Sequence, residues 1–412
     1  MEKRNTNILI IGAGPSGMVA AGYLQKHGID CLVIEKNEFP RFTIGESLLP
    51  KSMENFKEAG LLSALQKEGF QKKFGARFIK ERKIGEFDFA QKFDKGWDWT
   101  WQAPRADFDM ALAEENIRKG VKILFNTEVK KVEFESKRSR TEVLQKNGTK
   151  LQITANFIID ASGNGRVLAN QLGLNATPKV TGNSSIFTHI KETGRPRGKE
   201  GELITFEVIN TKTWFWYIPF SNGNTSLGFV GNNNWFSQFS NDNTKAFKTM
   251  LKKLDYYNGR FEDYPFLFEP VKLPNIAKGV KRLFGEGYVL TGNSAQFLDP
   301  IFSSGVAFAT ESGLKAAKLA LKQLQGENVD WQIDYADYME NGTRVFSSYV
   351  KEWYTGNLQK LFFYDSPKQE IKEQICAVLA GYVWDRKNPF VKNHRRIIKN
   401  VAKMIDQENL KI

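Results

Sequence analysis

Three glycines near the N-terminus have the spacing of a dinucleotide-binding turn. Gly12, Gly14 and Gly17 directly follow a short apolar run and precede an Ala-rich stretch. A pyrophosphate can sit on a helix N-terminus only where no Cβ keeps it away from the backbone. Glu35 lies 23 residues after Gly12, where its carboxylate is placed to accept hydrogen bonds from a ribose. The predicted nucleotide site comprises Gly12, Gly14, Pro15, Ser16, Gly17 and Glu35.

The elements around this turn are predicted from apolar periodicity. Residues 7–11 are a short apolar strand, the Ala-rich stretch to His27 is a helix, and residues 31–34 are a second strand that ends on Glu35. A βαβ unit of this length is typical of nucleotide binding. Further elements are expected as a helix over 109–119, a strand over 121–125, hairpin strands over 127–159, a β-rich segment over 171–277, a strand over 288–290, a helix that starts near Gly305, and helices in the remainder.

Composition narrows the class of protein. The chain has 412 residues, 41% of them apolar, and a net charge of +13. Cys31 and Cys376 have no ligand-like spacing, which excludes a zinc site or a disulfide framework and favours a reducing, cytoplasmic location. No apolar run approaches the roughly 20 residues that cross a bilayer, so we expect a soluble protein. Because the basic residues are mostly scattered, we expect no nucleic-acid partner. Because neither the cysteines nor the histidines have metal-ligand spacing, we expect no metal.

One denser basic patch lies near the C-terminus, interleaved with apolar residues at helical spacing. A surface helix with a solvated face explains such a pattern, and a docking surface for an acidic partner is the alternative. The patch comprises Arg386, Lys387, Lys392, Arg395, Arg396, Lys399 and Lys403.

Two later segments point to FAD as the nucleotide. Residues 158–163, which read IIDASG, and residues 289–295, which read VLTGNSA, resemble the second and third flavin-contacting segments of the FAD-dependent monooxygenase superfamily. The resemblance implies cofactor roles for Asp160 and Asn293. At the position of Asn293, the superfamily commonly has Asp. Arg105, which precedes the Phe108-Asp109 pair, resembles an arginine beside the cofactor in the same superfamily; the alternative is an ordinary surface arginine.

Three further segments resemble the flavin-dependent halogenases. Residues 39–50, FPRFTIGESLLP, are similar to the strap that crosses the flavin, and geranylgeranyl reductase-like proteins share a looser version. Residues 214–219, WFWYIP, match the WxWxIP motif, although an aromatic strand packed in a core would read the same. Residues 297–306, FLDPIFSSGV, are similar to the loop that joins flavin and halide. The resemblance implies roles for Arg41, Glu46 and Ser47, for Trp214 and Trp216 in catalysis, and for Asp299 and Pro300 beside the cofactor.

The halogenase resemblance also implies an anion site and an essential lysine. A helix is expected to start near Ser304 and Gly305, where unpaired N–H groups and the helix dipole can hold a halide or the negative edge of reduced flavin. Lys73 matches the family's lysine by the Gly-Ala-x-Phe pattern that follows it. An ammonium there would hydrogen-bond hypohalous acid, and a deprotonated amine could carry the halogen.

The resemblance implies an FAD-dependent oxidoreductase that halogenates an electron-rich phenol- or pyrrole-type substrate through C4a-peroxyflavin and hypohalous acid. Phe302 stands where tryptophan halogenases carry a glutamate, which speaks against free tryptophan. Some relatives act on substrates tethered to acidic acyl carrier proteins, so the basic patch could dock one. Without a second glycine fingerprint, a separate flavin reductase is expected to supply reduced FAD.

Two other functions stay open. An FAD-dependent hydroxylase or a geranylgeranyl reductase-like double-bond reductase would use the same fold without halide, and a non-catalytic flavin-binding protein would give no product. The three histidines have no catalytic or metal-ligand spacing, so no acid–base histidine is expected.

The expected fold is of the α/β class, with a Rossmann-like FAD-binding domain interleaved with a β-rich substrate lobe and followed by a C-terminal helical region. The predicted limits are 1–75, 104–170 and 281–325 for the FAD-binding domain, 76–103 and 171–280 for the substrate lobe, and 326–412 for the helical region.

Overall fold

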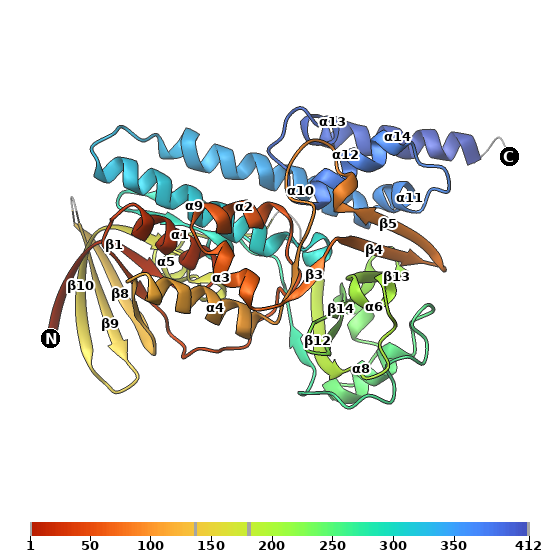
Figure 1. Ribbon diagram of the computed structural model, residues 1–412, viewed down its shortest axis with the longest axis horizontal. Helices are drawn as coiled ribbons and strands as arrows, with labels where there is room; N and C mark the ends of the chain where they lie inside the picture. Colours follow the sequence, from red (N-terminus) through yellow and green to blue (C-terminus); the bar gives the residue numbers. More distant parts are fainter. Residues whose placement is uncertain (1, 136–137, 179–182, 410–412) are drawn as a thin grey trace.

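A largely parallel sheet carries the N-terminal glycine turn. The computed structural model describes residues 2–135, 138–178 and 183–409 (Figure 1). Strands lie in the order β18 (Phe284–Gly285), β19 (Tyr288–Leu290), β10 (Lys150–Asp160), β1 (Glu2–Ile11), β2 (Cys31–Ile34) and β7 (Lys122–Leu124). The pairs from β19 to β7 are parallel, whereas β8 (Thr127–Glu135) and β9 (Arg138–Gln145) extend β10 as an antiparallel hairpin. The predicted strands at 7–11, 31–34 and 288–290 are therefore confirmed.

Helices cover this first sheet, and small residues let them approach closely. They are α1 (Pro15–Lys26), α2 (Lys51–Glu58), α3 (Leu62–Lys67), α4 (Arg105–Arg118), α5 (Val167–Gln171) and α9 (Ser304–Leu324). A Cβ on Gly313 of α9 would lie 2.3 Å from the carbonyl oxygen of Ser16 in α1, so only glycine permits this packing. The helix expected over 109–119 begins earlier, at Arg105, because Pro104 directly before it supplies a fixed φ of −56° that suits a helix start.

A seven-stranded sheet forms the second lobe. Its order is β16 (Val271–Leu273), β12 (Asn183–Lys191), β15 (Asn224–Asn232), β14 (Thr213–Pro219), β13 (Thr205–Asn210), β4 (Gly75–Lys80) and β5 (Lys83–Asp88). Side chains alternate across β14: Phe215 and Tyr217 pack under α8 (Asn243–Leu251), whereas Trp214 and Trp216 face the core shared with the C-terminal helices. The aromatic motif thus covers both faces of one buried strand.

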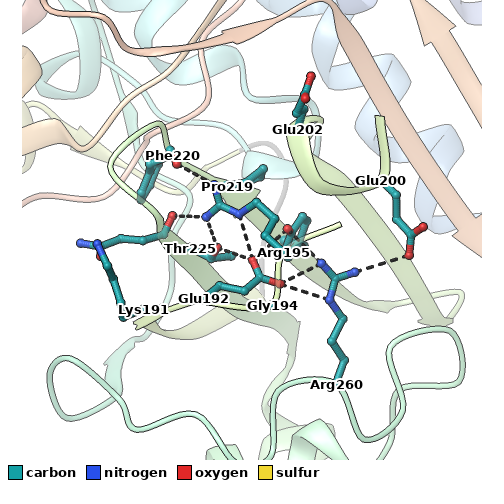
Figure 2. Close-up of polar contacts among 12 residues, drawn as sticks. Lys191, Glu192, Gly194, Arg195, Glu200, Glu202, Pro219, Phe220, Thr225 and Arg260 are labelled. Carbon is teal, nitrogen blue, oxygen red and sulfur yellow. Dashed lines mark hydrogen bonds and ion pairs between the residues drawn. The ribbon is translucent and has the colours of Figure 1, made fainter. Parts of the chain in front are cut away.

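A cluster of charged groups fixes one end of the second sheet (Figure 2). Glu192 is buried and pairs with Arg195 at 3.2 Å and with Arg260 at 2.8 Å. Thr225 and Tyr217 donate hydroxyl hydrogen bonds to the same carboxylate at 2.7 and 2.9 Å. These partners offset its desolvation and hold the pKa of Glu192 below its ordinary value.

Two short ladders and a helical layer complete the fold. β3 (Gln71–Lys73) pairs with β6 (Thr100–Gln102), and β11 (Asn175–Ala176) pairs with β17 (Gly279–Val280). The C-terminal layer, drawn in blue in Figure 1, packs Trp353 and Phe362 against Phe78 of β4. It comprises a π-helical turn (Trp331–Asp337), α10 (Tyr338–Tyr354), α11 (Asn357–Phe362), α12 (Gln369–Leu379), α13 (Pro389–Lys392) and α14 (His394–Asn409).

The C-terminal basic patch lies on α14 and the segment before it. The face of α14 that packs on the protein is buried and carries Ile398, Ala402 and Ile405. Every basic residue of the patch is exposed. Within the described residues, none of the helices is both long and apolar enough to cross a membrane.

Candidate active site

The glycine turn at the end of β1 is built for a close approach of backbone. Gly12 has a φ of 104°, and a Cβ there would lie 2.4 Å from the carbonyl oxygen of Ala161. A Cβ on Gly17 would lie 2.0 Å from the carbonyl oxygen of Gly12. At Gly14 a Cβ would meet only the Arg41 guanidinium, at 3.6 Å, so this glycine leaves one side of the turn open. A diphosphate therefore has room at the start of α1.

Glu35 closes the nucleotide end of the site. Its carboxylate accepts hydrogen bonds from the backbone N–H groups of Ala13 and Asn37, both at 2.9 Å. The Arg41 Nε lies 3.8 Å away. These contacts fix the carboxylate beside the turn, and its remaining lone pairs are available to ribose hydroxyls.

A cavity of about 640 Å³ runs from the glycine turn to the second sheet. It brings together segments that are far apart in sequence, which an elongated dinucleotide requires. Fourteen of the predicted site residues line it: Gly12, Gly14, Pro15, Ser16, Glu35, Arg41, Glu46, Ser47, Arg105, Trp214, Trp216, Asn293, Pro300 and Gly305. The other five, Lys73, Gly17, Asp160, Asp299 and Ser304, lie behind the wall rather than on it.

Asp160 supports the wall from beneath. Its fully buried carboxylate accepts hydrogen bonds from the N–H groups of Ser162 at 2.9 Å and Leu168 at 2.8 Å. Burial raises the pKa of this carboxyl, while the hydrogen bonds lower it. Since the segment 161–165 lines the cavity and Asp160 does not, its carboxylate positions that segment from behind.

The strap, residues 39–50, forms one side of the cavity, and each residue from 41 to 47 lines it. Arg105 Nη1 donates to the carbonyl oxygen of Ile44 at 3.0 Å, and its Nε and Nη2 bind Asp109 at 2.8 and 3.0 Å. Arg41 reaches the same Asp109 carboxylate at 3.1 Å. Arg105 is thus not a surface side chain; it ties the strap to α4.

Trp214 and Trp216 form the apolar far wall, with ring centroids 6.0 Å apart. The Trp216 ring lies on Gly228, where a Cβ would be 2.2 Å from it, and its Nε1 donates to Ser226 at 3.0 Å. Trp214 Nε1 donates to the Tyr354 hydroxyl at 3.0 Å, which donates in turn to Asp299 at 2.8 Å. A hydroxyl from α10 therefore joins the tryptophan wall to the loop before α9.

The loop at 297–305 delivers the start of α9 to the cavity. Asp299 caps a short helical turn by accepting from the Ile301 N–H at 3.1 Å, and Asn183 donates to it at 2.7 Å. Ser303 adopts a left-handed φ of 56°, and α9 begins at Ser304. Because Ser303, Gly305 and Val306 line the cavity, the N-terminal end of α9, where the first N–H groups of a helix have no partner within it, lies at the cavity wall.

Lys73 is 1% exposed and lies one layer behind the cavity. Its ammonium donates to Ser47 Oγ at 2.9 Å and to the carbonyl oxygen of Leu48 at 2.8 Å. Ser303 Oγ donates to the same Ser47 hydroxyl at 3.2 Å. Burial lowers the pKa of Lys73 to about 7. Ser47 therefore connects a neutralisable amine with the cavity and with the start of α9.

One contact of the strap involves a histidine for which the sequence pattern predicted no role. His189 Nε2 on β12 lies 2.7 Å from Glu46 Oε1 on the strap. The two groups are 143 residues apart in sequence, by 189 − 46, and no local spacing rule joins them. Tertiary packing therefore creates this pair, and the expectation that no histidine acts as an acid or base stays a prediction.

Comparison with known proteins agrees with this geometry. Residues 5–334 match the family described as FAD binding domain, which is most of the chain. The chain belongs to this FAD-binding family. Its glycine turn, fixed Glu35 and elongated cavity fit the cofactor, which makes the chain a flavoprotein and an FAD-dependent oxidoreductase.

Relatives of this FAD-binding protein include halogenating enzymes. It is 28% identical over 429 residues to a chlorinase of 1H-pyrrole-2-carbonyl groups on a peptidyl-carrier protein from Pseudomonas fluorescens, covering 97% of this chain and 94% of the relative. A flavoprotein/dehydrogenase from Cytophaga hutchinsonii has the same fold with a TM-score of 0.97 and 46% identity over 98% and 100% of the two chains. The flavin-dependent brominase Bmp2 matches with a TM-score of 0.84 and 23% identity over 98% and 100%.

Proposed function

We propose that this flavoprotein is a halogenase that replaces a hydrogen of an electron-rich aromatic ring, of phenol or pyrrole type, with chlorine or bromine. The observation that carries the proposal is the Lys73–Ser47–Ser303 connection. It places a buried amine of lowered pKa behind the point where the FAD cavity meets the start of α9. The similarity of this chain to the pyrrole chlorinase supports halogenation as the reaction.

Bound reduced FAD would supply the electrons that activate oxygen, and the protein supplies position, charge and exclusion of water. The N–H groups at Ser304 and Gly305 would hold the halide, since a helix start favours anions. The reaction consumes reduced flavin, oxygen, halide, a proton and the aromatic C–H compound, and yields oxidised flavin, the halogenated product and two waters.

Lys73 would hold the activated halogen species before it meets the ring. Its pKa of about 7 leaves a large share of amine unprotonated at neutral pH, so it can act as a nucleophile as well as a hydrogen-bond donor. The Ser47 hydroxyl accepts from both Lys73 and Ser303, which leaves its own proton to point elsewhere.

The apolar part of the cavity fits a flat aromatic substrate. Ile204, Phe206, Trp214, Trp216 and Ile218 line it from the second sheet. Phe302 packs against Tyr349 and Trp353 rather than offering a carboxylate, so an amino-acid ammonium would find no partner at that position. This composition favours phenol or pyrrole rings over free tryptophan.

The test mixes the reduced, FAD-loaded protein with oxygenated buffer, with and without bromide, and follows flavin absorbance and halogenation of a hypohalite scavenger. Bromide-dependent flavin oxidation kinetics with scavenger halogenation support the proposal. Kinetics indifferent to bromide, without a halogenated scavenger, refute it. The same mixing experiment with chloride in place of bromide shows which halide the protein prefers.

One observation favours the alternative, a hydroxylase or double-bond reductase that uses the same cofactor. The Lys73 amine is directed to Ser47 and to a backbone carbonyl and does not itself reach the cavity wall. In that case Lys73→Ala would leave turnover intact, and NAD(P)H would reduce the isolated protein rapidly.

We further propose a carrier-tethered substrate and a separate flavin reductase. The pyrrole chlorinase named above acts on a carrier-bound group. Arg386, Lys392, Arg395, Arg396 and Lys403 are exposed and form no ion pair within the described part of the chain, so their charge is available to an acidic carrier.

Charge reversal tests the carrier. The double variant Arg395→Glu/Arg396→Glu should raise KM for a carrier-tethered pyrrole at least tenfold and leave KM for the corresponding free acid or thioester fragment unchanged. The matched control is Lys248→Glu/Lys252→Glu, which reverses two exposed charges on and beside α8. An equal effect of both double variants would refute docking at α14.

A further inference from the structure

The strap carries a buried carboxylate that has almost no partners. Glu46 is 1% exposed, and neither of its oxygens accepts an aligned hydrogen bond from the described residues. Buried carboxylates are ordinarily surrounded by donors, as Glu192 is in Figure 2. Glu46 therefore departs from the usual pattern at a residue that lines the FAD cavity.

Among the residues that the structure describes, His189 is the one ionisable side chain within ion-pair distance of Glu46. The Nε2 atom lies 2.7 Å from Oε1, although the angle is outside hydrogen-bond limits. Two lone pairs would repel at that distance, so a proton must lie between the atoms, and a small ring rotation aligns it. The His189 ring is held by Phe42, Phe220 and Phe268, with centroids 5.7, 5.5 and 5.0 Å away.

The two nearby arginines, Arg41 and Arg105, bind groups other than Glu46. Arg105 donates to Asp109 and to strap carbonyls, and Arg41 pairs with Asp109 and approaches Glu35. A neutral His189 that donates from Nε2 would satisfy the Glu46 carboxylate without cancelling its charge. The protein beside the cavity would then hold one buried negative charge that neither arginine compensates.

We propose that Glu46 and His189 form a proton-sharing pair with a net negative charge, and that this charge lowers the reduction potential of the bound flavin. Reduction adds negative charge to a flavin, and a fixed carboxylate buried beside the cavity opposes it. A lower potential makes the reduced cofactor a stronger reductant toward oxygen. The inference needs only FAD binding and does not depend on halogenation.

The experiment measures the midpoint potential of the FAD-loaded protein at pH 7 by equilibration with a reference dye. Glu46→Gln keeps the size and one acceptor for His189 but removes the charge. It should shift the equilibrium toward reduced flavin at least tenfold, which is about 30 mV for two electrons. Glu192→Gln is the matched control, because it removes a buried carboxylate that two arginines already neutralise, and it should leave the potential within threefold of the wild type. An unchanged or lowered potential in Glu46→Gln refutes the proposal.

A second measurement decides the matter if the variant fails to bind FAD. The chain has three histidines, so ¹⁵N-histidine spectra of the wild type, with His27→Gln and His394→Gln for assignment, isolate His189. The proposal requires a neutral ring protonated at Nε2 at pH 7. A doubly protonated ring, or a neutral ring protonated at Nδ1, overturns it.

Discussion

Replacing Lys73 by methionine should change how stability depends on pH. Methionine keeps an unbranched side chain of similar length but cannot bind a proton. Burial lowers the pKa of Lys73 from 10.5 to about 7 on folding. Between these two values the unfolded chain binds more protons than the folded one, so the free energy of unfolding of the wild type rises with pH in this window.

The magnitude follows from the two pKa values. With 10.5 in the unfolded chain and about 7 in the folded one, the amine costs about 4 kcal/mol of stability at pH 7 and about 2 kcal/mol at pH 9. The advantage of Lys73→Met over the wild type should therefore shrink by about 2 kcal/mol between pH 7 and pH 9. The lost hydrogen bonds to Ser47 and Leu48 add an offset that is the same at both pH values.

Urea denaturation of both proteins at pH 7, 8 and 9 measures this difference. Lys72→Met is the matched control, because Lys72 lies on the same strand with an exposed side chain, and its curve should run parallel to the wild type. If the difference between Lys73→Met and the wild type is the same at pH 7 and pH 9, the amine does not titrate in this window, and its proposed role as a neutral nucleophile loses its basis.

Other predictions concern cofactor binding and the wall of the cavity. Gly14→Ala should fold with an unchanged melting temperature, because its Cβ would meet only Arg41 at 3.6 Å. It should weaken FAD binding roughly tenfold or more, because the Cβ would block the diphosphate. Fluorescence titration with FAD measures this affinity, and an unaltered affinity would show that the diphosphate lies elsewhere. Gly17→Ala, whose Cβ would lie 2.0 Å from a carbonyl oxygen, should lower stability as well as FAD binding, as thermal unfolding would reveal. Tyr354→Phe should cost about 1–3 kcal/mol in urea unfolding, since Trp214 Nε1 loses its acceptor and Asp299 a donor; a double-mutant cycle with Trp214→Phe that shows no coupling would contradict the hydroxyl bridge.

The identity of the fold was within reach of sequence reasoning because its signals are local. A βαβ unit needs an apolar strand, a glycine turn and a helix in immediate succession, so Gly12, Gly14, Gly17 and Glu35 could be placed from spacing alone. The alternation in β14 likewise follows from strand geometry: Trp214 and Trp216 share one face and Phe215 takes the other.

The wall of the site was harder to predict from the sequence, because a local motif does not show which partners a side chain contacts in the folded protein. Asp160 and Asp299 lie in flavin-type segments, but backbone and side-chain donors take up their carboxylates behind the cavity. Lys73 was expected to bind hypohalous acid or to carry the halogen, and only the structure showed that its amine donates to Ser47 and to the carbonyl oxygen of Leu48. Its expected role stays a prediction. The proposed limits of the two lobes and of the helical region remain a prediction.

The sequence by itself predicted a dinucleotide site at an N-terminal glycine turn, since close backbone approach demands glycine at fixed intervals. Only the tertiary structure decided which side chains meet around the cavity. Glu46 meets His189, which lies 143 residues later in the sequence. Trp214 reaches Asp299 through Tyr354, which lies 140 residues after Trp214 and 55 residues after Asp299. Burial and partner choice at such contacts depend on how sheets and helices pack, and pairwise spacing along the chain does not encode them.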